Sequence, residues 1–212
     1  MDRPLPARPE EGGREAEVDA DACLMLRFQN GDVHAFETLF SRHAHALVNF
    51  AYRFVRNREI AEELAQEVFL RVYDAAATYR VEARFRTWLY RIATNLCLNE
   101  LRRPRRRAAH ESLDSPSGDK TQGRPMDLVD DARPDPEAQL GRRDVAREIA
   151  RALGKLPEKQ RTAFVLNKYQ ELSYLEVAEV MNSTEKAVKS LIHRAKEGIA
   201  AQLAPLMREL MK

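Results

Sequence analysis

The sequence is organised around one stretch, FRTWLYRIATN at residues 85–95, which continues to the basic segment LRRPRRR at residues 101–107. Apolar residues recur at helical spacing from Phe85 to Leu96, so this stretch predicts a helix with one apolar stripe. The other side of the helix carries cations, a ring, hydroxyls and an amide, namely Arg86, Thr87, Tyr90, Arg91, Thr94 and Asn95. Residues 84–107 contain eight arginines and a single acid, Glu100, so the segment is strongly cationic.

This combination of rings and arginines suits single-stranded nucleic acid, because bases stack on aromatic rings while guanidinium groups bind phosphates. The residues alone leave a second interpretation equally open, in which the stretch is a buried core helix followed by a basic tail. The two interpretations differ in whether the polar side of the helix is exposed.

The composition of the whole chain narrows the class of protein. The 212 residues are 44% hydrophobic and 32% charged with a net charge of only +2, which fits small helical units whose charges are segregated along the chain. Cys23 and Cys97 form no Cys-x-x-Cys motif, so neither a zinc site nor a disulfide framework is indicated. No segment has the pattern of a signal peptide or a membrane span, and we expect a cytoplasmic protein without membrane insertion.

The residues before the central stretch predict an N-terminal domain at residues 17–107, preceded by a disordered extension at residues 1–16. Helices are expected near residues 19–30, 32–57 and 58–76, with Asp32 as a helix cap after Gly31. The second of these helices has a regular apolar stripe that we expect to be buried: Phe36, Leu39, Phe40, His43, Leu47, Phe50 and Phe54.

The third helix has an unusual outer face, where acids stand beside apolar residues such as Leu70 and Tyr73. Exposed apolar residues among acids are typical of a protein-docking surface, since the acids repel nucleic acid. A solvated charged face is the alternative.

A change of composition predicts a flexible acidic linker at residues 108–136. This segment has four prolines, and residues 111–140 hold eight acids against only Lys120, Arg124 and Arg133. The linker therefore cannot extend the basic surface.

The C-terminal domain at residues 137–212 predicts a helix-turn-helix. Ser173 and Glu176 have the spacing of a capping box, Asn182 suits the turn that follows, and Ser183 or Thr184 can cap the next helix. The outer face of that last helix carries Lys186, Lys189, Ser190, His193 and Arg194. A basic outer face favours major-groove DNA, although any helical hairpin satisfies the spacing alone. The expected fold is thus all-α, with two small helical domains joined by the linker.

Several motifs together resemble the bacterial sigma factors of the sigma-70 family, most closely the extracytoplasmic-function (ECF) group. They are FRTWLYRIATN with its basic extension, AEELAQEVFLRVY at 61–73, LPEKQRTAFVL at 156–166, LSYLEVAEVM at 172–181 and AVKSLIHRAK at 187–196. The resemblance covers about residues 19–203. Two departures are Asn182, where the family usually has glycine, and Leu191, at a frequently basic position.

The resemblance implies a factor that directs core RNA polymerase to promoters, docking on the clamp helices of the largest subunit and on the flap. It implies polymerase contacts at Glu62, Leu64, Gln66, Glu67, Phe69 and Leu70. It implies that melted minus-ten DNA is bound by Phe85, Arg86, Thr87, Trp88, Tyr90, Arg91, Asn95, Asn99, Arg102 and Arg103, with the loop at 79–84 helping to hold a flipped base. It implies minus-thirty-five contacts at Lys186, Lys189, Ser190, His193 and Arg194, and an anti-sigma factor as a further partner. Trp88 is equally compatible with a core position.

The linker has a defined reach in this scheme. A relaxed chain of roughly 30 residues spans about 30 Å, and a fully extended one about 100 Å. Promoter elements about two helical turns apart are on the order of 70 Å from each other. The linker reaches that far only when something holds it stretched, which in this family is the polymerase.

Two other classes of protein remain as alternatives. A stand-alone helix-turn-helix regulator would explain residues 173–199 but leave the acidic face and the central helix without a role. An enzyme acting on DNA would need acids clustered on a nucleic-acid face to hold metal ions. No nucleophile–base set, phosphate-binding glycine loop or metal cluster is recognisable, so we expect no catalytic residue, cofactor or metal.

Overall fold

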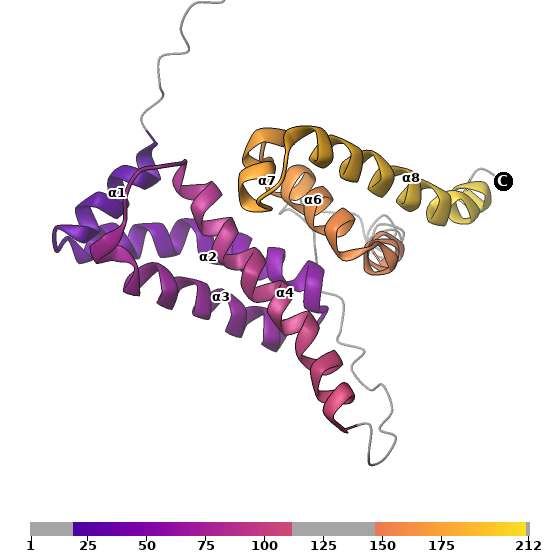
Figure 1. Ribbon diagram of the computed structural model, residues 1–212, viewed down its shortest axis with the longest axis horizontal. Helices are drawn as coiled ribbons and strands as arrows, with labels where there is room; N and C mark the ends of the chain where they lie inside the picture. The colour runs from indigo at the N-terminus through magenta and orange to yellow at the C-terminus, as the bar shows by residue number, and fades with distance from the viewer. Residues whose placement is uncertain (1–18, 112–146, 211–212) are drawn as a thin grey trace, which may run out of the picture.

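The computed structural model describes residues 19–111 and 147–210, and these residues are helical, as expected, with no strand among them. Figure 1 shows the helices in two groups, α1–α4 in one and α6–α8 in the other, and α7 of the second group contacts α4 of the first. The bounds are α1 Ala20–Gln29, α2 Val33–Val55, α3 Arg58–Asp74, the short 3-10 helix η1 Ala76–Thr78, α4 Phe85–Glu111, a helix over residues 147–155, α6 Glu158–Tyr169, α7 Tyr174–Val180 and α8 Glu185–Leu210.

Some predicted segments lie outside the described residues. They are the extension at 1–16, linker residues 112–136 and the start of the C-terminal domain at 137–146. The helix α4 continues to Glu111, four residues past the predicted domain boundary at 107. Among the helices described over 19–111 and 147–210, none combines the length and apolar character that crossing a bilayer requires.

The N-terminal unit, α1–α4, has caps that follow the sequence signals. Asp32 caps α2 by accepting a hydrogen bond from the backbone N–H of Ala35, and Gly31 before it has φ +96°, a left-handed conformation that favours glycine. Asn57 caps α3 in the same way. These local signals place the helix starts within a few residues of the prediction.

The core of this unit is aromatic. The Phe50 ring is fully buried, with its centroid 5.0 Å from that of Phe54 and 5.1 Å from that of Tyr90. The predicted stripe of α2 is buried except at two positions: Phe36 is partly buried, and Phe40 is 44% exposed, so the assignment of Phe40 to the core was wrong. Phe40 follows Leu39 directly, and neighbouring positions on a helix differ by about 100° in direction, which turns its ring toward the surface.

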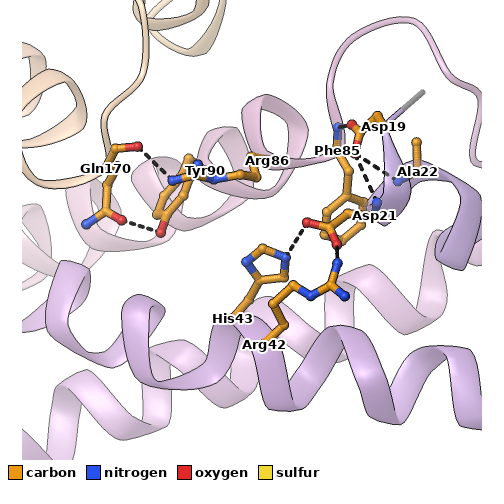
Figure 2. A network of polar contacts seen from close by, with 9 residues as sticks. All are labelled: Asp19, Asp21, Ala22, Arg42, His43, Phe85, Arg86, Tyr90 and Gln170. Carbon is orange, nitrogen blue, oxygen red and sulfur yellow. Dashed lines mark hydrogen bonds and ion pairs between the residues drawn. The ribbon is translucent and has the colours of Figure 1, made fainter. Parts of the chain in front are cut away.

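A polar network fixes the start of α4 to α1 (Figure 2). The Asp19 carboxylate caps α1 and also accepts a hydrogen bond from the Phe85 N–H at 2.6 Å. Asp21, buried two residues further on, binds the Arg42 guanidinium and accepts a hydrogen bond from Nε2 of His43 at 2.8 Å. A carboxylate only accepts hydrogen bonds, so the imidazole donates this one from Nε2.

The burial of His43 predicts an acid-sensitive stability. Desolvation lowers the pKa of His43 below its ordinary value of 6.5, although Asp21 acts in the opposite direction. As pH falls through 6.5, the unfolded chain therefore takes up this proton before the folded one, and stability is lost. We expect the urea concentration at the midpoint of unfolding to be lower below pH 6.5 than above it. The substitution His43→Gln should reduce this difference. An identical pH dependence in both proteins would contradict the prediction.

The C-terminal unit confirms the predicted helix-turn-helix. Ser173 and Glu176 form a reciprocal capping box at the start of α7, and Asn182 adopts a left-handed conformation with φ +47°. Thr184 accepts a hydrogen bond from the N–H of Ala187 at the start of α8. The turn between α7 and α8 thus forms from asparagine in place of glycine.

The two units touch each other. The helix α7 packs on α4 and α6 packs on α2, so one side of α4 faces its own unit and part of the other side faces the C-terminal unit. A single buried apolar cluster includes Leu89 and Leu96 of α4 together with Leu172 and Val177 of the C-terminal unit. This contact has consequences for the residues predicted to bind DNA.

Candidate polymerase and nucleic-acid interfaces

The outer face of α3 carries four of the six predicted polymerase contacts. Glu62 and Glu67 lie on it, each bound to an arginine one turn along the helix, Arg58 at 2.7 Å and Arg71 at 2.9 Å. Gln66 is exposed, and Leu70 is 61% exposed. These ion pairs are open to solvent and contribute little to stability, so the acids remain available to a partner.

The other two predicted contacts, Leu64 and Phe69, are buried in the helical core. Leu64 continues the apolar stripe that includes Val68, and the Phe69 ring packs against the rings of Phe36 and Phe40 at centroid distances of 6.2 and 4.6 Å. Leu64 and Phe69 therefore pack beneath this face and hold its exposed side chains in place.

Two exposed rings that were not predicted as contacts join this face. Tyr73, 57% exposed, packs on Phe28 and Phe36, and Phe40 of α2 lies over Phe69. The sequence places Tyr73 on this face as an apolar residue. It assigns Phe40 to the buried stripe of α2, because apolar residues occupy neighbouring positions of that helix. We call the following residues the docking surface: Phe40, Glu62, Gln66, Glu67, Leu70 and Tyr73.

The predicted minus-ten residues of α4 fall into three classes. Those exposed are Arg91, Asn95, Asn99, Arg102 and Arg103; Arg86 and Trp88 are partly buried; Phe85, Thr87 and Tyr90 are buried. Burial raises the pKa of Tyr90 to about 12, so its hydroxyl stays protonated and can donate. Both initial interpretations of this helix therefore apply, each to a different part of its surface.

A cavity of about 370 Å³ lies beside the loop between η1 and α4. Its walls come from the predicted loop, from Trp88 and Arg91 of α4 and from Glu179 of α7. The Trp88 ring packs edge-on against Tyr79, with centroids 5.0 Å apart. Aromatic, cationic and carboxylate groups thus surround a space where a planar ring can be stacked and hydrogen-bonded.

The outer face of α8 is exposed at all five predicted positions, namely Lys186, Lys189, Ser190, His193 and Arg194. The Lys189 ammonium lies 2.7 Å from the Glu185 carboxylate, which raises its pKa, and 5.6 Å from the centroid of the Tyr174 ring. Leu191 is partly buried against the core, so its side chain is directed toward the protein. No cluster of three or more metal-binding side chains occurs within the described part of the chain.

Comparison with known proteins adds independent findings. The family model described as "Sigma-70 region 2" matches residues 39–107, and the family model described as "Sigma-70, region 4" matches residues 146–197. The chain is 34% identical to the RNA polymerase sigma-H factor of Pseudomonas aeruginosa over 90% of its length and 97% of that protein. It is 33% identical to the ECF RNA polymerase sigma-E factor of Haemophilus influenzae, covering 91% of this chain and all of the relative.

Two solved structures have a similar arrangement of helices. One is CnrH in complex with the cytosolic domain of CnrY, with a TM-score of 0.65, 26% identity and coverage of 88% of this chain and 99% of that one. The other is the sigma factor RpoE in complex with the anti-sigma factor NepR from Bartonella quintana, with a TM-score of 0.60, 20% identity and coverage of 80% and 96%. The second likeness concerns the fold alone.

Proposed function

Because the chain belongs to the ECF group of sigma-70 family RNA polymerase sigma factors, we propose that its three surfaces divide the work of promoter recognition. The docking surface binds core polymerase, α4 with its loop cavity holds melted minus-ten DNA, and α8 reads the minus-thirty-five element. One observation carries this division: the acidic and apolar surface on α2 and α3 is separate from the cationic surfaces of α4 and α8.

The docking surface suits the clamp helices of the largest polymerase subunit. Exposed rings and Leu70 supply apolar contact area, while Glu62 and Glu67 repel DNA and select a cationic protein surface. The same acids steer association at low salt.

The proposed minus-ten site works by binding energy alone and needs no covalent step. Extruding a base costs a few kcal/mol of lost stacking, which a pocket returns through new stacking and hydrogen bonds. Trp88 at the loop cavity provides the ring, and Asn95 with Arg91 lies on the exposed part of α4 that follows. The arginines beyond them, Arg102 and Arg103, neutralise phosphates.

Lys189 provides a test of the α8 surface. We expect Lys189→Ala to lower the affinity of the holoenzyme for its best promoter about tenfold. Promoters in which the base read by Lys189 has been changed should show a much smaller loss of affinity. The reason is that Lys189 is exposed near the start of α8, the part of a recognition helix that reaches base edges. Affinity is measured over a set of promoters with single base changes.

Lys155→Ala, at an exposed lysine outside α8, is the matched control and should leave the affinities unchanged. A uniform loss over all promoter variants with Lys189→Ala would assign that residue to phosphate binding and contradict base reading.

The proposal also covers the protein's location, its lack of catalysis and a regulatory partner. The protein acts in the cytoplasm, where polymerase is, and it has no catalytic role of its own. An anti-sigma factor restrains it, as the family resemblance implies; the similar structure of CnrH is likewise that of a complex, formed with the cytosolic domain of CnrY.

Run-off transcription tests the proposed function directly. Purified chain plus core polymerase should initiate at a subset of genomic fragments, and core polymerase alone should not. Failure to initiate on any template, combined with strong specific binding of duplex DNA by the chain alone, would favour a stand-alone regulator. Metal-dependent cleavage of DNA by the pure chain would favour an enzyme.

A further inference from the structure

Both ends of the loop at residues 79–84 are tied to one helix, α1. At the start of the loop, the side-chain amide of Gln29 donates to three backbone carbonyls, those of Ala76, Ala77 and Tyr79, at 2.8, 3.3 and 3.2 Å. At the end of the loop, the Asp19 carboxylate accepts a hydrogen bond from the Phe85 N–H at 2.6 Å (Figure 2). Asp19 is the cap of α1 and Gln29 is its last residue, so the two ends of this helix hold the two ends of the loop.

The residues between these two points are mostly open to solvent. The side chains of Arg80, Val81, Glu82 and Arg84 are exposed. The one tight turn among them is local, since the Glu82 N–H donates to the Arg80 carbonyl at 2.9 Å. A segment that buries so little gains little stability from its own packing, so the points that hold its ends decide where it lies.

The helix α1 is well placed to hold the loop, because it is itself fixed to the core. Met25 is fully buried, and Ala22 is 3% exposed. The Asp21 carboxylate binds Arg42 and accepts from His43 at 2.8 Å, which joins α1 to α2 (Figure 2). The position of the loop is therefore set by packed helices through two polar contacts.

The shape of the loop cavity depends on that position. Arg80, Glu82 and Ala83 of the loop line it together with Trp88 of α4. Tyr79, whose ring packs edge-on against Trp88, is buried at the start of the loop. If the ends of the loop were free, an entering base would have to order these walls as it bound, and the lost conformational entropy would weaken binding.

We propose that Gln29 is a positioning residue for the minus-ten base: together with Asp19 it holds the loop at 79–84 in place, so the loop cavity is formed before DNA arrives. The inference rests on the proposed function, because it requires the cavity to take a base. Gln29 acts through the loop and lies outside the docking surface. An amide suits this role, since its N–H groups can serve several carbonyls and a carboxylate at the same place has no proton to donate.

Trp88 is the only tryptophan of the chain, so its fluorescence reports on the loop in the full-length protein without a label. We expect quenching by acrylamide to increase about twofold in Gln29→Ala, because the released loop no longer covers the partly buried ring. Gln29→Glu should do the same, since a side chain of equal length loses the donor. Gln29 is exposed, so neither substitution leaves a cavity in the core.

Asn30→Ala is the matched control. Asn30 follows Gln29 directly, and its side-chain amide also donates to a backbone carbonyl, but to that of Leu26 within α1, at 2.8 Å. Its removal disturbs the end of α1 and leaves the contacts of Gln29 with the loop intact. Quenching of Trp88 should therefore stay as in the parent.

Binding of single-stranded DNA to the holoenzyme tests the role in base recognition. The probe is the fluorescent minus-ten strand of a promoter found by run-off transcription, either intact or in a series in which each strand lacks one base. In the parent, loss of the base that enters the cavity weakens binding. We expect Gln29→Ala to lower the affinity for the intact strand about tenfold and to leave the affinity for the strand without that base unchanged.

The outcomes separate this role from the proposed function. Unchanged Trp88 quenching in Gln29→Ala would overturn the proposal, and so would an equal loss of affinity for intact and abasic strands, which indicates a general effect on the fold. The same changes in Asn30→Ala would overturn it as well. A parent holoenzyme that binds every abasic strand as tightly as the intact one would instead refute the proposed base-binding function, and Trp88 quenching would still decide whether Gln29 holds the loop.

Discussion

Phe50→Ala is expected to lower the free energy of unfolding by about 3–5 kcal/mol, the largest loss we anticipate for a single substitution. The ring is fully buried between Phe54 and Tyr90, so its removal leaves a cavity between α2 and α4 that these neighbours only partly fill. Urea denaturation followed by circular dichroism measures the change. The same cavity loosens Tyr90, so binding of single-stranded DNA should weaken at temperatures near the lowered midpoint.

Phe40→Ala, ten positions earlier on the same helix, is the matched control. Its ring is 44% exposed, so truncation should cost far less stability while reducing affinity for core polymerase. Equal stability losses at the two positions would show that Phe40 belongs to the core, and would remove it from the docking surface.

Leu70→Arg is expected to weaken binding to core polymerase about 30-fold, corresponding to about 2 kcal/mol. Leu70 is 61% exposed on the docking surface, about one helical turn from Glu67 and from Tyr73 along α3. An arginine there removes apolar contact and meets a cationic partner with a like charge. Affinity is measured by fluorescence anisotropy of labelled protein titrated with core polymerase.

Val81→Arg is the control for this substitution, because Val81 is 54% exposed in the loop before α4 and lies outside the docking surface. It should leave polymerase affinity unchanged in the absence of DNA. Equal losses for the two arginine variants, or no loss for Leu70→Arg, would contradict the assignment of the docking surface to α2 and α3.

Local sequence signals were sufficient for the helices themselves. Asp32, the Ser173–Glu176 capping box and Asn182 each satisfy backbone groups within a few residues of themselves, so their effect is readable without any tertiary contact. The exposed basic face of α8 was predictable for the same reason, since its buried stripe has one regular helical period.

Periodicity also determined that α4 has a buried stripe, but it could not determine what covers the opposite side. That depends on Gln170, some eighty residues away, whose contacts with Arg86 and Tyr90 exist only because α7 packs on α4. Likewise, only the packing of α2 on α3 distinguishes buried Phe69 from exposed Phe40. The sequence alone therefore determined the helices and the sign of their charges, because these depend on near neighbours. The tertiary structure decided which charged and aromatic groups are free to bind a partner, because exposure depends on residues distant in the chain.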